Sequence, residues 1–206
     1  MVTGMLADRR DELGRARTQV TGRLHRLLLE LLPGGARKFL SARQARTLIA
    51  TVRPRDLAGK TRRWLAVELT GELEATGKKT RALDKALTEL VTARGSTLPE
   101  LYGIGPSGAA RLLANAGDIH RFASWNGTAP LDASSGSQAR HRLSRAGNRR
   151  INRVLHIMAV VQRRNQTKGL ACYGARRAGG MPSMMAMRAL RRRLSNVVFS
   201  RMLADR

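Results

Sequence analysis

Residues 98–113 read LPELYGIGPSGAARLL and contain a turn built on two glycines. Gly103 and Gly105 permit backbone angles that are closed to other residues, and Pro106 suits the first position of a following helix. The amides at such a helix start lie at the positive end of the helix dipole and favour a phosphate. This is the helix-hairpin-helix pattern, a clamp on the DNA backbone that does not read base sequence; an ordinary helix–turn–helix corner is the alternative. The DNA contacts predicted here are Gly103, Gly105, Ser107, Gly108 and Arg111.

The charge of the chain favours a polyanionic partner. Its 206 residues include 39 Lys and Arg against 14 Asp and Glu, which gives a net charge of +25. The imbalance is concentrated near the end of the chain, because residues 140–206 hold 17 of the basic residues and one acid, Asp205. We therefore expect the nucleic-acid face mainly in the C-terminal third. A basic protein of the membrane surface is the alternative, although arginines in turns as well as helices suit nucleic acid better.

Several classes of site and location are disfavoured. Cys172 is the single cysteine, so no intrachain disulfide can form and a reducing cytoplasm is expected. The sequence has no apolar run of the roughly 18 residues that span a bilayer, and its start lacks the apolar region of a signal peptide. Between Leu101 and Ala204 only Asp118 and Asp132 are acidic, so we predict no metal site and no membrane partner. A cytoplasmic location fits these features.

The fold class predicted from periodicity is mainly α. Apolar residues at spacings of three and four predict a helix over residues 5–32, a short helix capped by Ser41, and a long helix over residues 57–92. Leucines of the long helix recur at near-heptad spacing, which indicates either a coiled-coil seam and a homo-oligomer through residues 57–92, or packing within one chain. We divide the chain into a helical coiled-coil region, 1–96, and a compact helical domain containing the hairpin, 97–206.

A polar segment from Asp132 to Gly136 opens into a run of arginines. By itself Ser134-Ser135-Gly136 is compatible with a simple turn. The basic neighbours favour more, because guanidinium groups can hold a scissile phosphate and stabilise the charge that develops on it, leaving a serine hydroxyl as nucleophile. His141 is either a base or a phosphate-binding side chain. The arginines predicted to contact DNA are Arg140, Arg142, Arg145, Arg149 and Arg150.

Three strings, LYGIGP at 101–106, WNGTAPLDASSG at 125–136 and HRLSRAGNR at 141–149, closely resemble the C-terminal transposase domain of the bacterial IS-110 insertion-sequence family. The helices upstream resemble the coiled-coil segment of that family. The resemblance implies DNA recombination by two catalytic halves: a RuvC-like N-terminal domain with acidic magnesium ligands, and a C-terminal domain with a nucleophilic serine. It also implies a guide RNA encoded by the element, and a bacterial protein that is associated with the nucleoid. The nucleophile maps onto Ser135, with Ser134 as the neighbouring alternative.

Two departures from the family pattern affect the expected activity. The chain begins where the RuvC-like domain would already have ended, so no magnesium site is expected in it, and several residues common in the family are absent between Phe122 and Ala123. We therefore expect a truncated, catalytically impaired transposition protein that still binds DNA or structured RNA. The alternatives are a non-catalytic binding module, for instance one that pairs with an intact transposase through the long helix, and a basic nucleoid- or ribosome-associated protein.

Overall fold

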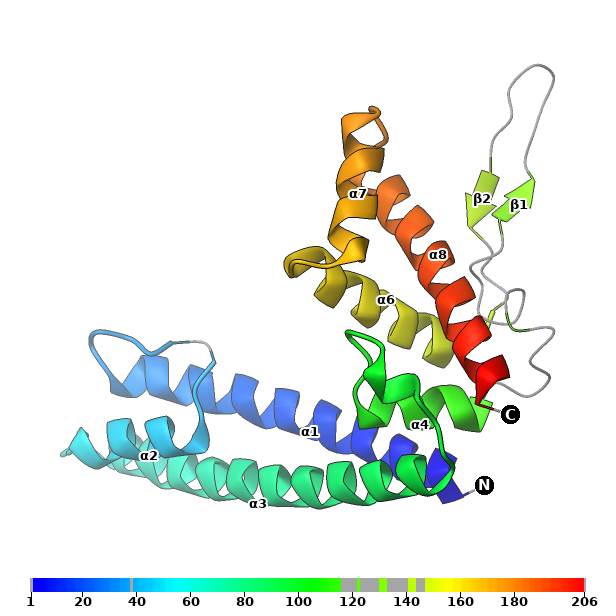
Figure 1. Cartoon of the computed structure of the whole chain (residues 1–206). Helices are drawn as coiled ribbons and strands as arrows, with labels where there is room; N and C mark the ends of the chain where they lie inside the picture. The colour runs from blue at the N-terminus through cyan, green and yellow to red at the C-terminus, as the bar shows by residue number, and fades with distance from the viewer. Residues whose placement is uncertain are drawn as a thin grey trace. The chain divides into compact units, whose positions relative to one another are not determined.

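The computed structural model describes residues 2–37, 39–115, 122, 130–132, 141–143 and 147–205 (Figure 1). The chain is mainly α-helical, as the sequence predicts. The helices are α1 (Val2–Leu31), α2 (Ala42–Thr51), α3 (Leu57–Ala93), the 3₁₀ turn η1 (Leu98–Glu100), α4 (Pro106–Asn115), α6 (Arg149–Arg164), α7 (Lys168–Ala178) and α8 (Ser183–Ala204). Two short strands, β1 (Pro130–Asp132) and β2 (His141–Leu143), lie between α4 and α6.

The chain forms two compact units. One comprises residues 8–86, and the other comprises residues 1–7 and 87–206. Because α1 and α3 are continuous helices, each contributes residues to both units. The boundary at 96/97, which separates the coiled-coil region from the transposase-like domain by sequence pattern, stays a prediction.

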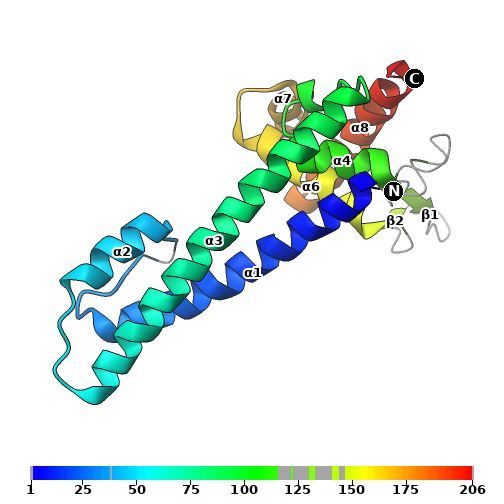
Figure 2. The same ribbon diagram turned by 90° about the horizontal axis from the view of Figure 1, so that it is seen from below.

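Within residues 8–86, α1 and α3 lie side by side in opposite directions (Figures 1 and 2). Arg10 pairs with Asp84 at 3.0 Å near one end, and Arg62 pairs with Glu30 at 2.5 Å near the other. The apolar core of this unit is formed by α1, α2 and α3 and comprises Val20, Leu24, Leu28, Ala45, Ile49, Ala66 and Leu73. Part of the leucine stripe of the long helix therefore packs within the chain, while self-association stays a prediction.

The predicted cap of α2 is confirmed in detail. The Ser41 hydroxyl accepts a hydrogen bond from the Gln44 amide at 3.2 Å, and the Gln44 side chain accepts one from the Ser41 amide at 2.9 Å. This reciprocal capping box satisfies two donors that a helix start would otherwise leave unpaired. At the start of α3, Asp56 accepts from the Gly59 amide at 2.9 Å, and backbone hydrogen bonds lower the pKa of its exposed carboxyl group.

The core of the other unit is formed by the end of α3 together with η1, α4, α6 and α8. Its largest fully buried side chains include Leu87, Leu112, Phe122, Leu155 and Leu190. Helices α6, α7 and α8 pack on one another, and α4 packs on α6. Strands β1 and β2 pair in antiparallel fashion with Asp132 opposite His141. The sequence analysis did not anticipate this strand pair.

Candidate nucleic-acid interface

The glycine turn between η1 and α4 is held against α6 by backbone geometry. Gly103 has φ +95°, a conformation that favours glycine. A Cβ atom at Gly103 would lie 3.2 Å from both Cα and the carbonyl oxygen of Met158 on α6. The turn is closed by the Ile104 amide, which donates to the Leu101 carbonyl at 2.9 Å. Glycine is therefore required at position 103 both for conformation and for the close approach of α6.

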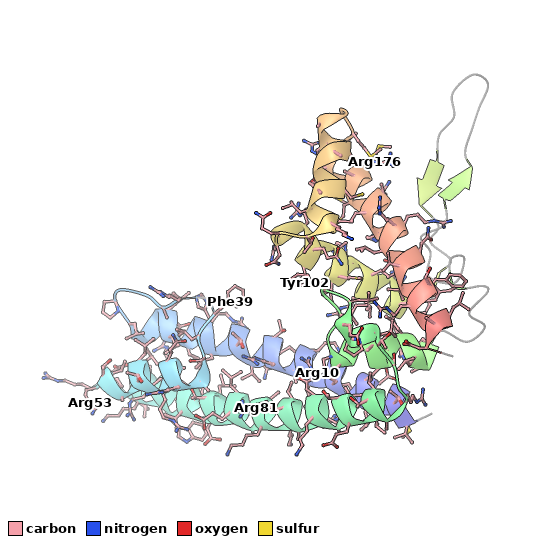
Figure 3. The ribbon with its side chains drawn as sticks, viewed as in Figure 1. Arg10, Phe39, Arg53, Arg81, Tyr102 and Arg176 are labelled. Carbon is pink, nitrogen blue, oxygen red and sulfur yellow. The ribbon has the colours of Figure 1, made fainter. Side chains whose placement is uncertain are left out.

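Two further contacts fix this turn. Ile104 is only 5% exposed and belongs to the core. The Gln162 side-chain amide, at the other end of α6 from Arg149, donates to the Tyr102 carbonyl at 2.9 Å. Tyr102 itself lies on the turn, with its side chain about half exposed (Figure 3). Gly169 packs so closely on Gln162 that a Cβ atom at that position would overlap its side chain. Sequence reasoning missed Gln162. The signal that could have revealed it is a polar residue at a position on the buried face of α6.

The start of α4 has the predicted geometry. Pro106 is its first residue, and the Ala109 amide donates to the Gly105 carbonyl at 3.0 Å. The amides of Ser107 and Gly108 precede that first bond, and amides at the start of a helix have no acceptor within the helix. Gly105 is exposed, and a Cβ atom there would meet nothing within 4 Å. This helix start therefore lies beside open space at Gly105.

Gly108 and Arg111, the other predicted contacts on α4, face the interior. A Cβ atom at Gly108 would lie 3.3 Å from the Val154 side chain. Arg111 is only 4% exposed, and its carbonyl accepts from the Asn115 side chain at 2.9 Å. Ala109 and Ala110, which lie between Gly108 and Arg111 in the sequence, are fully buried. These positions mainly support packing, and Arg111 has little surface to offer a phosphate.

Arg149 and Arg150 are exposed at the start of α6. Two amides at this helix start already have an acceptor. The Asn148 side chain accepts hydrogen bonds from the amides of Arg150 at 2.9 Å and Ile151 at 3.3 Å. An anion at this end of α6 would therefore bind to the arginine side chains rather than to those two amides.

The serine segment lies mostly outside the described residues. Ser134, Ser135, Arg140 and Arg145 all fall there, and Arg142 is described only by its backbone in β2. Asp132 and His141, the described residues on either side of 133–140 in the sequence, lie opposite each other in the strand pair. The predicted roles of these residues stay predictions.

With this geometry in place, comparison with known proteins identifies the segment. Residues 95–173 match the model of the Transposase IS116/IS110/IS902 family. Over this segment the chain is similar to transposases of the IS116/IS110/IS902 family. It is also similar to the "Insertion element IS110 uncharacterized 43.6 kDa protein" of Streptomyces coelicolor, with 30% identity over 146 residues. That match covers 66% of this chain and 36% of the relative, so the chain spans about a third of that relative's length.

The transposase-family match includes η1, α4, the strand pair and α6, whereas α8 lies beyond it. Among the residues that the structure describes, no three His, Cys, Asp or Glu side chains are grouped so as to hold a metal ion. In the described part of the chain, no helix is long and apolar enough to cross a membrane.

A carboxylate at the end of α8 forms hydrogen bonds with the start of the matched segment. Asp205 accepts hydrogen bonds from the Thr97 amide at 2.8 Å, the Thr97 hydroxyl at 2.6 Å and the Ser96 hydroxyl at 2.9 Å. Desolvation would raise the pKa of Asp205, but these hydrogen bonds and the charge of Arg201 hold it below its usual value. Arg201 also pairs with Glu100 at 3.0 Å. Asp205, directly after α8, thus anchors Ser96 and Thr97, the two residues before η1, and sequence reasoning missed it.

Proposed function

We propose that this chain is a DNA transposition protein that binds DNA through the η1–α4 turn and the start of α6, and joins strands through Ser135. The observation that carries the proposal is the family match, which covers the turn, the paired strands around Ser135 and the arginines of α6 as one continuous segment. The net charge of +25 supports a DNA partner, because basic proteins bind phosphate backbones largely by releasing counterions.

In the proposed reaction, the Ser135 hydroxyl attacks a DNA phosphorus and loses its proton to a base, for which His141 is the candidate. A phosphoserine ester forms, the bond from phosphorus to the deoxyribose oxygen breaks, and that oxygen leaves with a proton. Attack on the ester by a hydroxyl of another DNA end reverses these steps and restores serine. Arginine side chains stabilise the negative charge that builds up on the phosphate oxygens. Those proposed for this role are Arg140, Arg142, Arg145 and Arg149.

The test is to trap the covalent intermediate on a nicked duplex that carries an insertion-element end. The purified chain is incubated with guide RNA, with and without an added intact RuvC-like domain of the family, and adducts are resolved under denaturing conditions. We expect an adduct that Ser135→Ala abolishes and that the matched control Ser134→Ala retains. An adduct that survives Ser135→Ala would refute the assigned nucleophile. Duplex binding without any adduct in either condition would instead establish a non-catalytic binding module.

The proposal extends to a second copy of the chain. Leu57, Trp64 and Val67 of α3 are 81%, 61% and 47% exposed, which is unusual for large apolar side chains on one helix. Burial of this surface between two chains would give the predicted homo-oligomer through residues 57–92. Light scattering on the purified chain tests it: Trp64→Glu should shift an oligomer to monomer, and a wild type that is monomeric at high micromolar concentration would refute it.

A further inference from the structure

Helix α8 carries three arginines close together on one side. Arg188 is followed at i+3 by Arg191 and at i+4 by Arg192, spacings that place side chains on neighbouring turns of a helix. Like charges at these spacings repel one another and destabilise an isolated helix. Arg193, in contrast, is directed elsewhere and lines a shallow groove with Asn196 and Ser200. The three grouped arginines therefore need a compensating interaction.

The protein supplies only part of that compensation. Arg191 donates through Nη2 to the Asn152 side chain on α6 at 2.9 Å. Its Nε atom is buried, as is Nη1 of Arg192, and neither has a hydrogen-bond partner among the residues that the structure describes. A buried donor without an acceptor costs free energy, and more so when it belongs to a charged group. Two guanidinium nitrogens thus lack the acceptors that their burial calls for.

Negative charge is also absent from the stretch of sequence that contains α6, α7 and α8. Residues 147–204 contain 13 Lys and Arg and no Asp or Glu. Burial, together with the charge of Arg188, lowers the pKa of Arg191, as expected where a cation is desolvated next to another cation. A bound anion would relieve both effects, since it would bring acceptor oxygens and opposite charge at once.

A phosphate group matches these requirements. Its oxygens accept hydrogen bonds from guanidinium forks, and the pairing is charge-assisted. Asn152 accepts the hydrogen bond from Arg191 and lies three residues after Arg149. Arg149 is therefore on the same side of α6 as the contact with α8. It lies about one turn of α6 away from the residue that Arg191 contacts.

We propose that Arg188, Arg191 and Arg192 of α8 form, with Arg149 of α6, a second binding site for the phosphate backbone of duplex DNA. We call this set the α6–α8 basic face. It rests on the proposed function in that the chain binds DNA, but it is separate from the η1–α4 turn, and its α8 residues lie outside the segment that matches the family.

The test measures duplex DNA binding by fluorescence anisotropy over a range of salt concentrations. The site variant is Arg188→Gln/Arg192→Gln. The matched control, Arg176→Gln/Arg193→Gln, removes two exposed charges that lie outside the face, on α7 and α8 (Figure 3 labels Arg176). Each phosphate contact contributes roughly 0.9 to the slope of log K against log salt. We therefore expect the site variant to lower that slope by about 2 and to weaken binding at least about tenfold, with less than half of either change in the control.

A measurement of stability separates ligand binding from a structural role. If the arginines serve to bind phosphate, relieving their repulsion should leave the melting temperature of the site variant equal to or above that of the wild type. A lower melting temperature together with unchanged binding would show a structural role and overturn the proposal. Equal losses of slope and affinity in the site and control variants would overturn it too, because they would indicate diffuse attraction to a polyanion.

The η1–α4 turn provides the remaining comparison. A wild type that fails to bind duplex DNA defeats both the proposed function and the second site. Binding that is weakened by Gly105→Asp at the turn but not by the α8 variant defeats the second site alone. Protection of Arg188 and Arg192 from phenylglyoxal by bound duplex, with Arg193 remaining reactive, is the direct signature that we expect of the α6–α8 basic face.

Discussion

Replacing Asp205 by alanine removes the acceptor that holds the start of η1. Three hydrogen bonds end on this carboxylate, from the amide and hydroxyl of Thr97 and the hydroxyl of Ser96. Hydrogen bonds to a charged group are each worth about 1.5–3 kcal/mol when buried, and the partial exposure of Asp205 reduces that value. We expect a total loss of about 1–2 kcal/mol, or about 2–8 °C in melting temperature followed by circular dichroism.

The pKa of Asp205 determines the pH range in which this carboxylate stabilises the fold. The hydrogen bonds and Arg201 lower the pKa of Asp205 in the folded state, so its stabilisation is present above the unfolded-state pKa of about 4. The stabilisation is lost as the pH falls through the lower folded-state pKa. The difference between wild type and Asp205→Ala should therefore be full at pH 6 and shrink steadily below pH 4.

The control is Glu100→Gln, which breaks only the exposed pair with Arg201 at 3.0 Å. Exposed ion pairs contribute at most about 1 kcal/mol, so this variant should unfold close to the wild type at every pH. If Asp205→Ala is as stable as the wild type at pH 6, or if its deficit persists unchanged at pH 3, the carboxylate does not anchor Ser96 and Thr97 as described.

Three further predictions concern single contacts, each measured as a free energy of unfolding in urea. Gly103→Ala should destabilise by about 1–3 kcal/mol because of its positive φ and the backbone of Met158, whereas Gly105→Ala, with open space around its Cβ, should cost less than half as much. Gln162→Leu should cost about 1–3 kcal/mol by leaving the Tyr102 carbonyl without its donor, and an unchanged value would show that water replaces it. Ser41→Ala should cost about 1 kcal/mol through loss of the capping box, and no loss would rule out a stabilising role for that cap.

The features that sequence analysis predicted well are local ones. The cap at Ser41, the helix start at Pro106 and the long helix from Leu57 depend on residues within a turn or two of each other, so propensity and spacing suffice. The mainly α fold class follows from the same periodicity.

The features that it missed depend on contacts between distant parts of the chain. Gln162 meets Tyr102 across 60 residues, and Asp205 meets Thr97 across 108, and no local pattern encodes such a meeting. Arg111 was predicted to contact DNA as part of the hairpin, and its burial by tertiary packing could not be foreseen from the local pattern. Each strand of the pair has only three residues, and an alternating pattern of apolar and polar residues cannot be recognised over so short a length.

Helix α6 carries a basic surface at one end and the support of the glycine turn at the other. Arg150 and Gln162 are twelve residues apart, which at 1.5 Å per residue is about 18 Å along the helix axis. A DNA strand advances about 3.4 Å per base pair, so the same distance corresponds to about five base pairs. If the proposed contacts at both ends of α6 bind one duplex, the length of α6 sets the distance between the phosphates that are bound at its two ends. The footprint of the protein would then be set by the length of a helix and not by the order of the bases.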